Sequence, residues 1–156
     1  MQILLHTALE TVTLPATVTT IGTEAFAGCE SLTTVTFAEG SLLSEIKMSA
    51  FKGCTALVAF GENGRNAEDP FLIPLNVKNI GEYAFDGCAM QKLAFADGSS
   101  LTTIGYKAFS NCKSLVEIDI PKNASAIDYD AFYGCTALTS ASLSASCSCS
   151  SSQMAM

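Results

Sequence analysis

Seven cysteines, one histidine and a pair of closely spaced aspartates are the residues of this 156-residue sequence that could do chemistry. Two of the cysteines, Cys147 and Cys149, lie in a Ser-rich stretch near the C-terminus. The other five recur at one position of a repeated segment, and they are Cys29, Cys54, Cys88, Cys112 and Cys135. Because a free cysteine behaves as a small hydrophobic residue, this recurrence predicts a ladder of side chains that face a core.

Two reactive roles for this cysteine ladder remain as alternatives. Neighbouring rungs of stacked repeats would lie ~4.8 Å apart, a separation at which disulfides are conceivable. An odd number of cysteines and the loss of packing at each bridge argue against them. Zinc ligands commonly come from C-x₂-C pairs, and no such pair occurs within the repeats. We predict no metal site and no cofactor; for Cys147 and Cys149 we weigh acylation against chance composition.

Few residues remain for catalysis. A Cys–His or Ser–His–Asp arrangement would have to use His6, the single histidine, which we expect to be solvent-exposed outside the repeats. No Gly-rich phosphate loop with a following Lys occurs. Asp128 and Asp130 flank Tyr129 at variable repeat positions, which favours a solvated face; a Ca²⁺ site is the alternative, and it would need further oxygen ligands. We predict no catalytic residue and no enzyme.

The elements that position the cysteines form a repeat with the pattern I-x-x-x-A-F-x-x-C. The five copies begin at Ile21, Ile46, Ile80, Ile104 and Ile127. Their Phe residues step by 25, 34, 24 and 23 positions, close to the ~20–29-residue period of leucine-rich repeats. Five coincident copies in one chain indicate a repeat architecture.

Each repeat has two halves with different periods. After the cysteine, apolar residues at i and i+2 predict a strand with one inward face, as in Leu32-x-x-Val35-x-Phe37. In the A-F-x-x-C half, the apolar positions fall within an arc of about 140° at ~100° per residue, which predicts a short helical or 3₁₀ segment. A connecting segment, which we call a return, then leads from the strand to the next I-x-x-x-A-F-x-x-C segment. It begins either with Pro, as at Pro15, Pro74 and Pro121, or with Ala-Asp/Glu-Gly, as at Gly40 and Gly98.

These patterns predict an α/β repeat solenoid. We expect a right-handed leucine-rich-repeat solenoid with a parallel β-sheet on one side and short helical or 3₁₀ turns on the other. It comprises about five repeats over residues 1–143. The 34-residue step contains an insertion at residues 61–70, whose Gly, Asn and Pro residues predict an exposed loop. Residues 144–156 are predicted to be a disordered Ser-rich tail.

Composition narrows the possible functions. Apolar residues make up 49% of the chain and charged residues 15%, which excludes an intrinsically disordered protein. The net charge of -7 argues against a nucleic-acid partner, because phosphate binding draws on clustered Lys and Arg. No apolar run approaches the ~18 residues of a membrane span. The first residues lack the features of a signal peptide, so we expect either a cytoplasmic protein or a fragment whose export signal lies elsewhere.

The combined motif L-x-x-I-x-I-P-x-x-V-x-x-I-G-x-x-A-F-x-x-C closely resembles the BspA-like (Treponema pallidum type) leucine-rich repeats. The resemblance covers residues 9–143. It implies a non-enzymatic adhesion module, on the cell surface or secreted, that binds another protein such as a host or extracellular matrix protein. It does not identify that partner.

The exposed positions of the predicted strands are the main candidate for binding. They are rich in small hydroxyl side chains, with a few charges near the middle of the chain. The candidate binding residues are Thr34, Thr36, Lys92, Glu117, Asp119 and Ser140. A solvated face on which Thr serves β propensity is the alternative, and the insertion at residues 61–70 is a second candidate for binding.

We therefore expect a non-catalytic protein-protein interaction or adhesion module that uses the exposed sheet face of the solenoid. The alternative is a structural fragment of a larger repeat protein without autonomous function, since no polar cap is evident at either end of the repeats.

Overall fold

The computed structural model describes residues 8–62 and 68–143, and within these ranges the chain forms strands and turns but no helix. Seven strands follow one side of the molecule: β1 (Thr11–Leu14), β3 (Thr34–Phe37), β5 (Ala59–Glu62), β6 (Phe71–Ile73), β8 (Lys92–Phe95), β10 (Glu117–Ile120) and β12 (Ser140–Leu143). Five two-residue strands follow the other side: β2 (Thr20–Ile21), β4 (Glu45–Ile46), β7 (Asn79–Ile80), β9 (Thr103–Ile104) and β11 (Ala126–Ile127).

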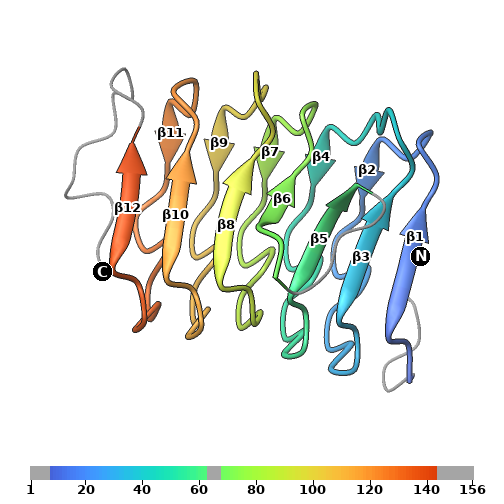
Figure 1. Ribbon diagram of the computed structural model, residues 1–156, viewed down its shortest axis with the longest axis horizontal. Coiled ribbons are helices and arrows are strands. Elements are labelled where there is room, and N and C mark those ends of the chain that lie inside the picture. Colours follow the sequence, from blue (N-terminus) through green and yellow to red (C-terminus); the bar gives the residue numbers. More distant parts are fainter. Residues whose placement is uncertain (1–7, 63–67, 144–156) are drawn as a thin grey trace.

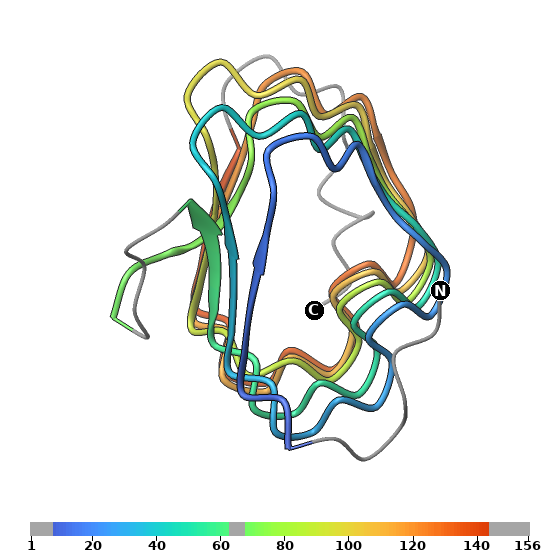
Figure 2. The same cartoon turned by 90° about the vertical axis from the view of Figure 1, so that its right-hand side faces the viewer.

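The strands wind into a parallel β-solenoid of about five turns, as the repeat predicts (Figure 1). The first set forms what we call the front wall, made of the sheets β1-β3-β5 and β12-β10-β8-β6. The second set forms the back sheet, in the order β11-β9-β7-β4-β2. Seen along the solenoid axis, successive turns superimpose around one core (Figure 2). Register follows the repeat, with Val12 opposite Val35 and Ile21 opposite Ile46.

The expected helical segments are not observed in the described residues. The I-x-x-x-A-F-x-x-C segment is instead a run of tight turns, because residues with positive φ interrupt any right-handed helix. In the first repeat these are Glu24 (φ 55°) and Gly28 (φ 73°). Their counterparts in the later repeats, also at positive φ, are Ser49, Gly53, Tyr83, Gly87, Lys107, Asn111, Asp130 and Gly134.

Backbone hydrogen bonds in this segment alternate between two kinds of partner. The N–H of Phe26 donates to the carbonyl of Ala50 in the next repeat, at 2.8 Å. The flanking N–H groups of Ala25 and Ala27 donate instead to carbonyls three residues back, at 3.2 Å. The backbone is satisfied partly by the neighbouring turn of the solenoid, so the segment has no need of the i→i−4 ladder of a helix.

The core contains a stack of phenylalanine rings, one from each repeat. Neighbouring rings are nearly parallel, with centroids 5.1–5.5 Å apart and interplanar angles of 1–7°. The stack comprises Phe26, Phe51, Phe85, Phe109 and Phe132, each at most 4% exposed. This offset spacing lies in the favourable range for aromatic pairs.

The insertion divides the front wall, in a way that the sequence did not predict. The sequence predicts residues 61–70 as an exposed loop. In the structure β5 runs on to Glu62 and pairs with β3, whereas β6 pairs with β8. The two strands lie side by side because Phe60 and Phe71 both point into the core and stack with centroids 4.8 Å apart.

The two kinds of return are joined by asparagine amides. The Nδ2 of Asn76, in the Pro74 return, donates to the carbonyl of Ser41 in the preceding Gly40 return at 2.8 Å. Asn123, in the Pro121 return, donates to the carbonyl of Ser99 in the same way. These contacts fasten each Pro-initiated return to the acidic-Gly return before it.

Some sequence-based expectations fall outside the described residues. They concern His6, Cys147, Cys149 and the tail at 144–156. In the ranges that the structure does describe, no helix has the length and apolar character needed to cross a membrane.

The phenylalanine stack predicts a large effect of truncation. Phe85→Ala or Phe109→Ala should lower the free energy of unfolding by ~3–5 kcal/mol, because each ring is fully buried between two others. Urea denaturation measures this change. Val116→Ala, at a side chain that is 41% exposed, is the control and should change it by less than ~1 kcal/mol. Losses below ~1 kcal/mol at both Phe positions would contradict the stack as a stabilising element.

Candidate functional site

Four of the six predicted binding residues lie together on the front wall. Glu117 of β10 is opposite Lys92 of β8 on one side and Ser140 of β12 on the other. Asp119 lies two residues further along β10 and therefore faces the same side of the sheet. All four side chains are exposed. The parallel register of three adjacent repeats thus gathers residues that are 23 to 25 positions apart in the sequence.

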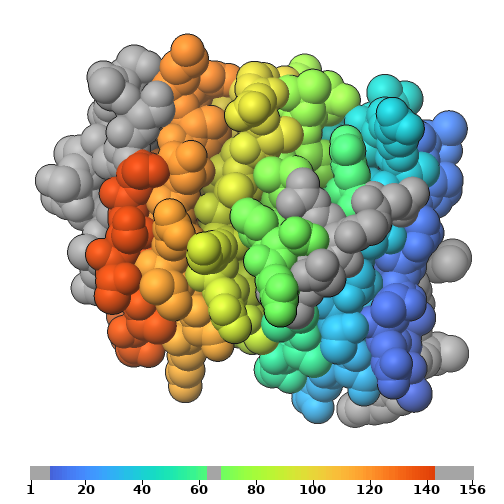
Figure 3. Space-filling model, in the orientation of Figure 1, coloured from blue at the N-terminus to red at the C-terminus, as the bar shows by residue number. Residues whose placement is uncertain are grey.

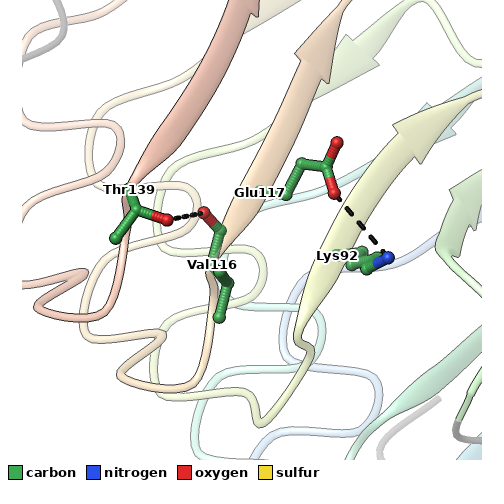
Figure 4. Close-up of polar contacts among 4 residues, drawn as sticks. All are labelled: Lys92, Val116, Glu117 and Thr139. Atoms are coloured by element: carbon green, nitrogen blue, oxygen red, sulfur yellow. Dashed lines mark hydrogen bonds and ion pairs between the residues drawn. The ribbon is translucent and has the colours of Figure 1, made fainter.

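Polar contacts link neighbouring strands at and around this group of four residues. The Nζ of Lys92 lies 3.8 Å from the Oε2 of Glu117, and the Thr139 hydroxyl donates to the Val116 carbonyl at 3.4 Å (Figure 4). The Ser142 hydroxyl donates to the Oδ1 of Asp119 at 2.6 Å. Both members of the ion pair are more than half exposed, so the pair contributes little to stability and remains available to a partner.

A hollow of about 250 Å³ opens beside this group. Its lining comes from the end of the insertion and from β8 and β10: Pro70, Lys92, Leu93, Ala94, Glu117 and Asp119. Figure 3 looks onto this front wall. In Figure 2 the end of β5 and the segment that leads into β6 project outward from the wall. The insertion therefore borders the hollow. The two candidates for binding that the sequence offered separately, the exposed strand positions and the insertion, thus lie next to each other.

Thr34 and Thr36 lie elsewhere on the front wall. Both are on β3, which is separated from β8 by β5 and β6. The Thr36 hydroxyl is 2.9 Å from that of Thr13 on β1, and the hydroxyls of Thr34 and Thr33 are 3.4 Å apart. The structure therefore groups Lys92, Glu117, Asp119 and Ser140 but does not bring the two threonines to them.

The five repeated cysteines form the predicted ladder, and all of them are buried free thiols. The disulfide alternative is therefore not observed. Each thiol from the second repeat onward donates to the carbonyl of the preceding repeat's core phenylalanine, at 3.1–3.4 Å. The pairs are Cys54–Phe26, Cys88–Phe51, Cys112–Phe85 and Cys135–Phe109. A weak donor in a tight space explains cysteine at this position better than a purely apolar residue would.

The environment of these thiols suppresses their reactivity. Burial raises the pKa of Cys54 to about 12, and the adjacent Cys29 adds to the effect. Burial also raises the pKa of Cys88 well above its usual range. For Cys112, a hydrogen bond with Cys135 and then burial raise the pKa. Since the thiolate is the nucleophile and the metal ligand, Cys54, Cys88 and Cys112 are inert at neutral pH. Cys135 differs, because its hydrogen bond with Cys112 lowers the pKa of its thiol.

The described residues contain no group of three or more His, Cys, Asp or Glu side chains arranged to hold a metal ion. Asp128, one of the two residues of the Ca²⁺ alternative, instead accepts a hydrogen bond at its Oδ1 from the N–H of Tyr129, at 2.8 Å.

A group of tyrosines on the turns that follow the back sheet was not predicted from the sequence. The chain has four tyrosines, Tyr83, Tyr106, Tyr129 and Tyr133, and each falls at a variable position of I-x-x-x-A-F-x-x-C. Tyr83, Tyr106 and Tyr129 follow one another at intervals of 23 residues. Confinement of every tyrosine to these positions is the signal that could have identified the group.

Comparisons with known proteins agree with this architecture. The sequence matches the BspA type leucine rich repeat region in six copies, over residues 3–66 and 66–154. The chain belongs to the BspA-type leucine-rich repeat family. Proteins built from this repeat are generally interaction or adhesion modules and are typically non-catalytic. No curated protein matches the chain.

Three crystal structures are similar to this BspA-type chain. The leucine-rich repeat protein of T. pallidum is 29% identical with a TM-score of 0.68, over 86% of this chain and 59% of that one. The pneumococcal vaccine antigen PcpA is 25% identical with a TM-score of 0.66, over 85% and 29%. A leucine-rich repeat protein from Bacteroides ovatus is 25% identical with a TM-score of 0.56, over 88% and 38%. The chain thus spans less than two thirds of each.

The thiol ladder predicts a loss of stability in alkaline solution. An unfolded chain loses the Cys54 proton near pH 9, whereas the folded chain retains it until about pH 12. Between these values the unfolded state binds fewer protons, so the free energy of unfolding falls as pH rises, by about 1.4 kcal/mol per pH unit for this thiol.

Urea denaturation of the wild type and of Cys54→Ala from pH 8 to 11 measures this effect. The variant should lose stability less steeply above pH 9, whatever its stability at pH 8. Equal slopes would show that the Cys54 thiol is not protected by the fold.

Proposed function

We propose that this chain is a non-catalytic protein-protein interaction or adhesion module that binds its partner with the exposed side of β8, β10 and β12. The observation that carries the proposal is the hollow beside Lys92, Glu117 and Asp119, bordered by Pro70 of the insertion. It places charges of both signs beside Pro70 and Ala94 on the exposed side of a sheet. The family's general role in interaction and adhesion supports the same conclusion.

The residues around the hollow suit recognition of a polar protein surface. Lys92 and Glu117 offer one cation and one anion within 3.8 Å, and Asp119 adds a second carboxylate. Such rim charges select partners by complementary charge and orient the encounter. Pro70 and Ala94 supply the apolar part of the lining, and Ser140 extends the polar part along the next strand. Thr34 and Thr36 would belong to a separate contact at the other end of the wall.

By the resemblance to BspA-type repeats, we propose a host or extracellular matrix protein as the partner and the cell surface or the exterior as the location. Similarity to a pneumococcal vaccine antigen favours this setting.

A charge-reversal pair tests the proposed surface. The wild type and the variant Glu117→Lys/Asp119→Lys are applied to an array of purified extracellular matrix proteins, and binding is measured by surface plasmon resonance. We expect a saturable partner whose affinity falls at least about tenfold in the variant, equivalent to about 1.4 kcal/mol. The fold should persist, because exposed charges contribute little to stability.

The matched control is Glu30→Lys/Glu39→Lys, which changes the net charge by the same amount at exposed positions outside β8, β10 and β12. It should bind as the wild type does. An equal loss of affinity in both variants would show that binding depends on overall charge and not on the proposed surface. The absence of any saturable partner on the array would overturn the proposal for this class of protein.

A further inference from the structure

A second exposed surface lies on the turns between the back sheet and the cysteine ladder. We call it the tyrosine strip; it comprises Tyr83, Tyr106, Tyr129 and Tyr133 with Lys52 and Lys107. Tyr83 and Tyr106 pack edge to face with centroids 5.6 Å apart, and Tyr106 and Tyr129 are 5.1 Å apart. Lys107 bridges Tyr106 and Tyr133, with its Nζ 5.1 and 5.0 Å from the two centroids. The strip is therefore continuous across four repeats.

The strip is not part of the core. Tyr129 is 66% and Tyr133 is 53% exposed, which makes them the most exposed tyrosines of the chain and places them at one end of the strip. The repeat itself does not require them, because the same turns carry Thr23 and Ala27 in the first repeat. Clustered exposed aromatic side chains commonly mark interaction surfaces, and tyrosine is among the residues that contribute most to binding energy.

The chemistry of the strip favours a cation. Its rings already hold ammonium groups at three places, with the Nζ of Lys52 4.6 Å from the Tyr83 centroid in addition to the two contacts of Lys107. Asp128 and Asp130 flank Tyr129 in the sequence, and the Oδ1 of Asp128 accepts a hydrogen bond from the backbone N–H of Tyr129. The chain as a whole carries a charge of -7. Exposed tyrosine rings that attract ammonium groups, flanked in the sequence by two aspartates on an acidic protein, suit a positively charged partner.

We propose that the exposed end of the tyrosine strip, formed by Tyr106, Tyr129 and Tyr133, docks an arginine-bearing basic segment of a partner protein. Arginine fits better than lysine because its planar guanidinium can stack on a tyrosine ring and still bind a carboxylate edge-on. This surface lies on the turns and not on β8, β10 and β12, so it is independent of the front-wall site. A chain with both surfaces could contact two partners at once.

Intrinsic fluorescence gives a direct readout, because the chain has no tryptophan and all four tyrosines belong to the strip. The probe is a 12-residue peptide of alternating Arg and Gly, added to the full chain at physiological salt. We expect a saturable change in tyrosine emission. In Tyr129→Ala/Tyr133→Ala the affinity should fall about tenfold, as expected for loss of two ring contacts, while Tyr83 and Tyr106 still report binding.

Two controls separate ring contacts from general attraction between opposite charges. Leu75→Ala/Val116→Ala removes two exposed apolar side chains elsewhere, and like the tyrosine variant it leaves the charge at -7; it should bind as the wild type does. A peptide with citrulline in place of arginine keeps the shape but loses the charge and should bind at least about tenfold more weakly. Thermal unfolding verifies that each variant is folded.

Undiminished binding by the tyrosine variant, or equal binding of the citrulline peptide, would overturn the proposal. A response to neutral oligosaccharides with none to the arginine peptide would also overturn it and assign the strip to glycans instead.

Discussion

Every part of this molecule depends on hydrogen bonds and ring contacts between neighbouring repeats. Within a single repeat, half of the turn segment's N–H groups have no partner, and the core phenylalanine has no ring to stack on. Phe51 shows both dependencies: its N–H donates to Ala84 of the next repeat, and its ring lies between those of Phe26 and Phe85. A repeat of about 24 residues is too small to bury its own apolar face, so stability is a property of adjacent pairs.

The cysteines belong to the same network. The Phe26 carbonyl accepts from the Cys29 N–H within its own repeat and from the Cys54 thiol in the next. A carbonyl has two lone pairs, so the thiol satisfies a second acceptor site that no backbone donor reaches. Serine would offer a stronger donor but a smaller, more polar side chain in an apolar layer, and alanine would offer no donor. The composition that first suggested redox or metal chemistry is thus explained by packing.

Spacing alone predicted the solenoid and the cysteine ladder, because each is a property of residues that recur once per turn, as the phenylalanines of the stack also do. The helical side was not correctly predicted. Its apolar positions fit a helical arc, but Glu24 takes a positive φ that its residue type does not signal, and the bond from Phe26 to Ala50 crosses between repeats. The pairing of Lys92 with Glu117 could be expected from register, whereas the place of Pro70 beside them depends on how the insertion folds back.

The insertion shows how the architecture accommodates change on one wall without disturbing the other. Opposite β5 and β6, the back sheet continues without a gap, since β4 pairs directly with β7. On the front wall the extra strand is accepted because Phe60 and Phe71 fill one widened layer, each packing edge to face against Phe85. Since repeats contact only their neighbours, the cost of this irregularity is confined to one turn. The front wall is thereby split into two surfaces, while Tyr83, Tyr106 and Tyr129, which all follow the insertion, are spaced by 23 residues. The insertion therefore changes the front wall and leaves the back sheet continuous.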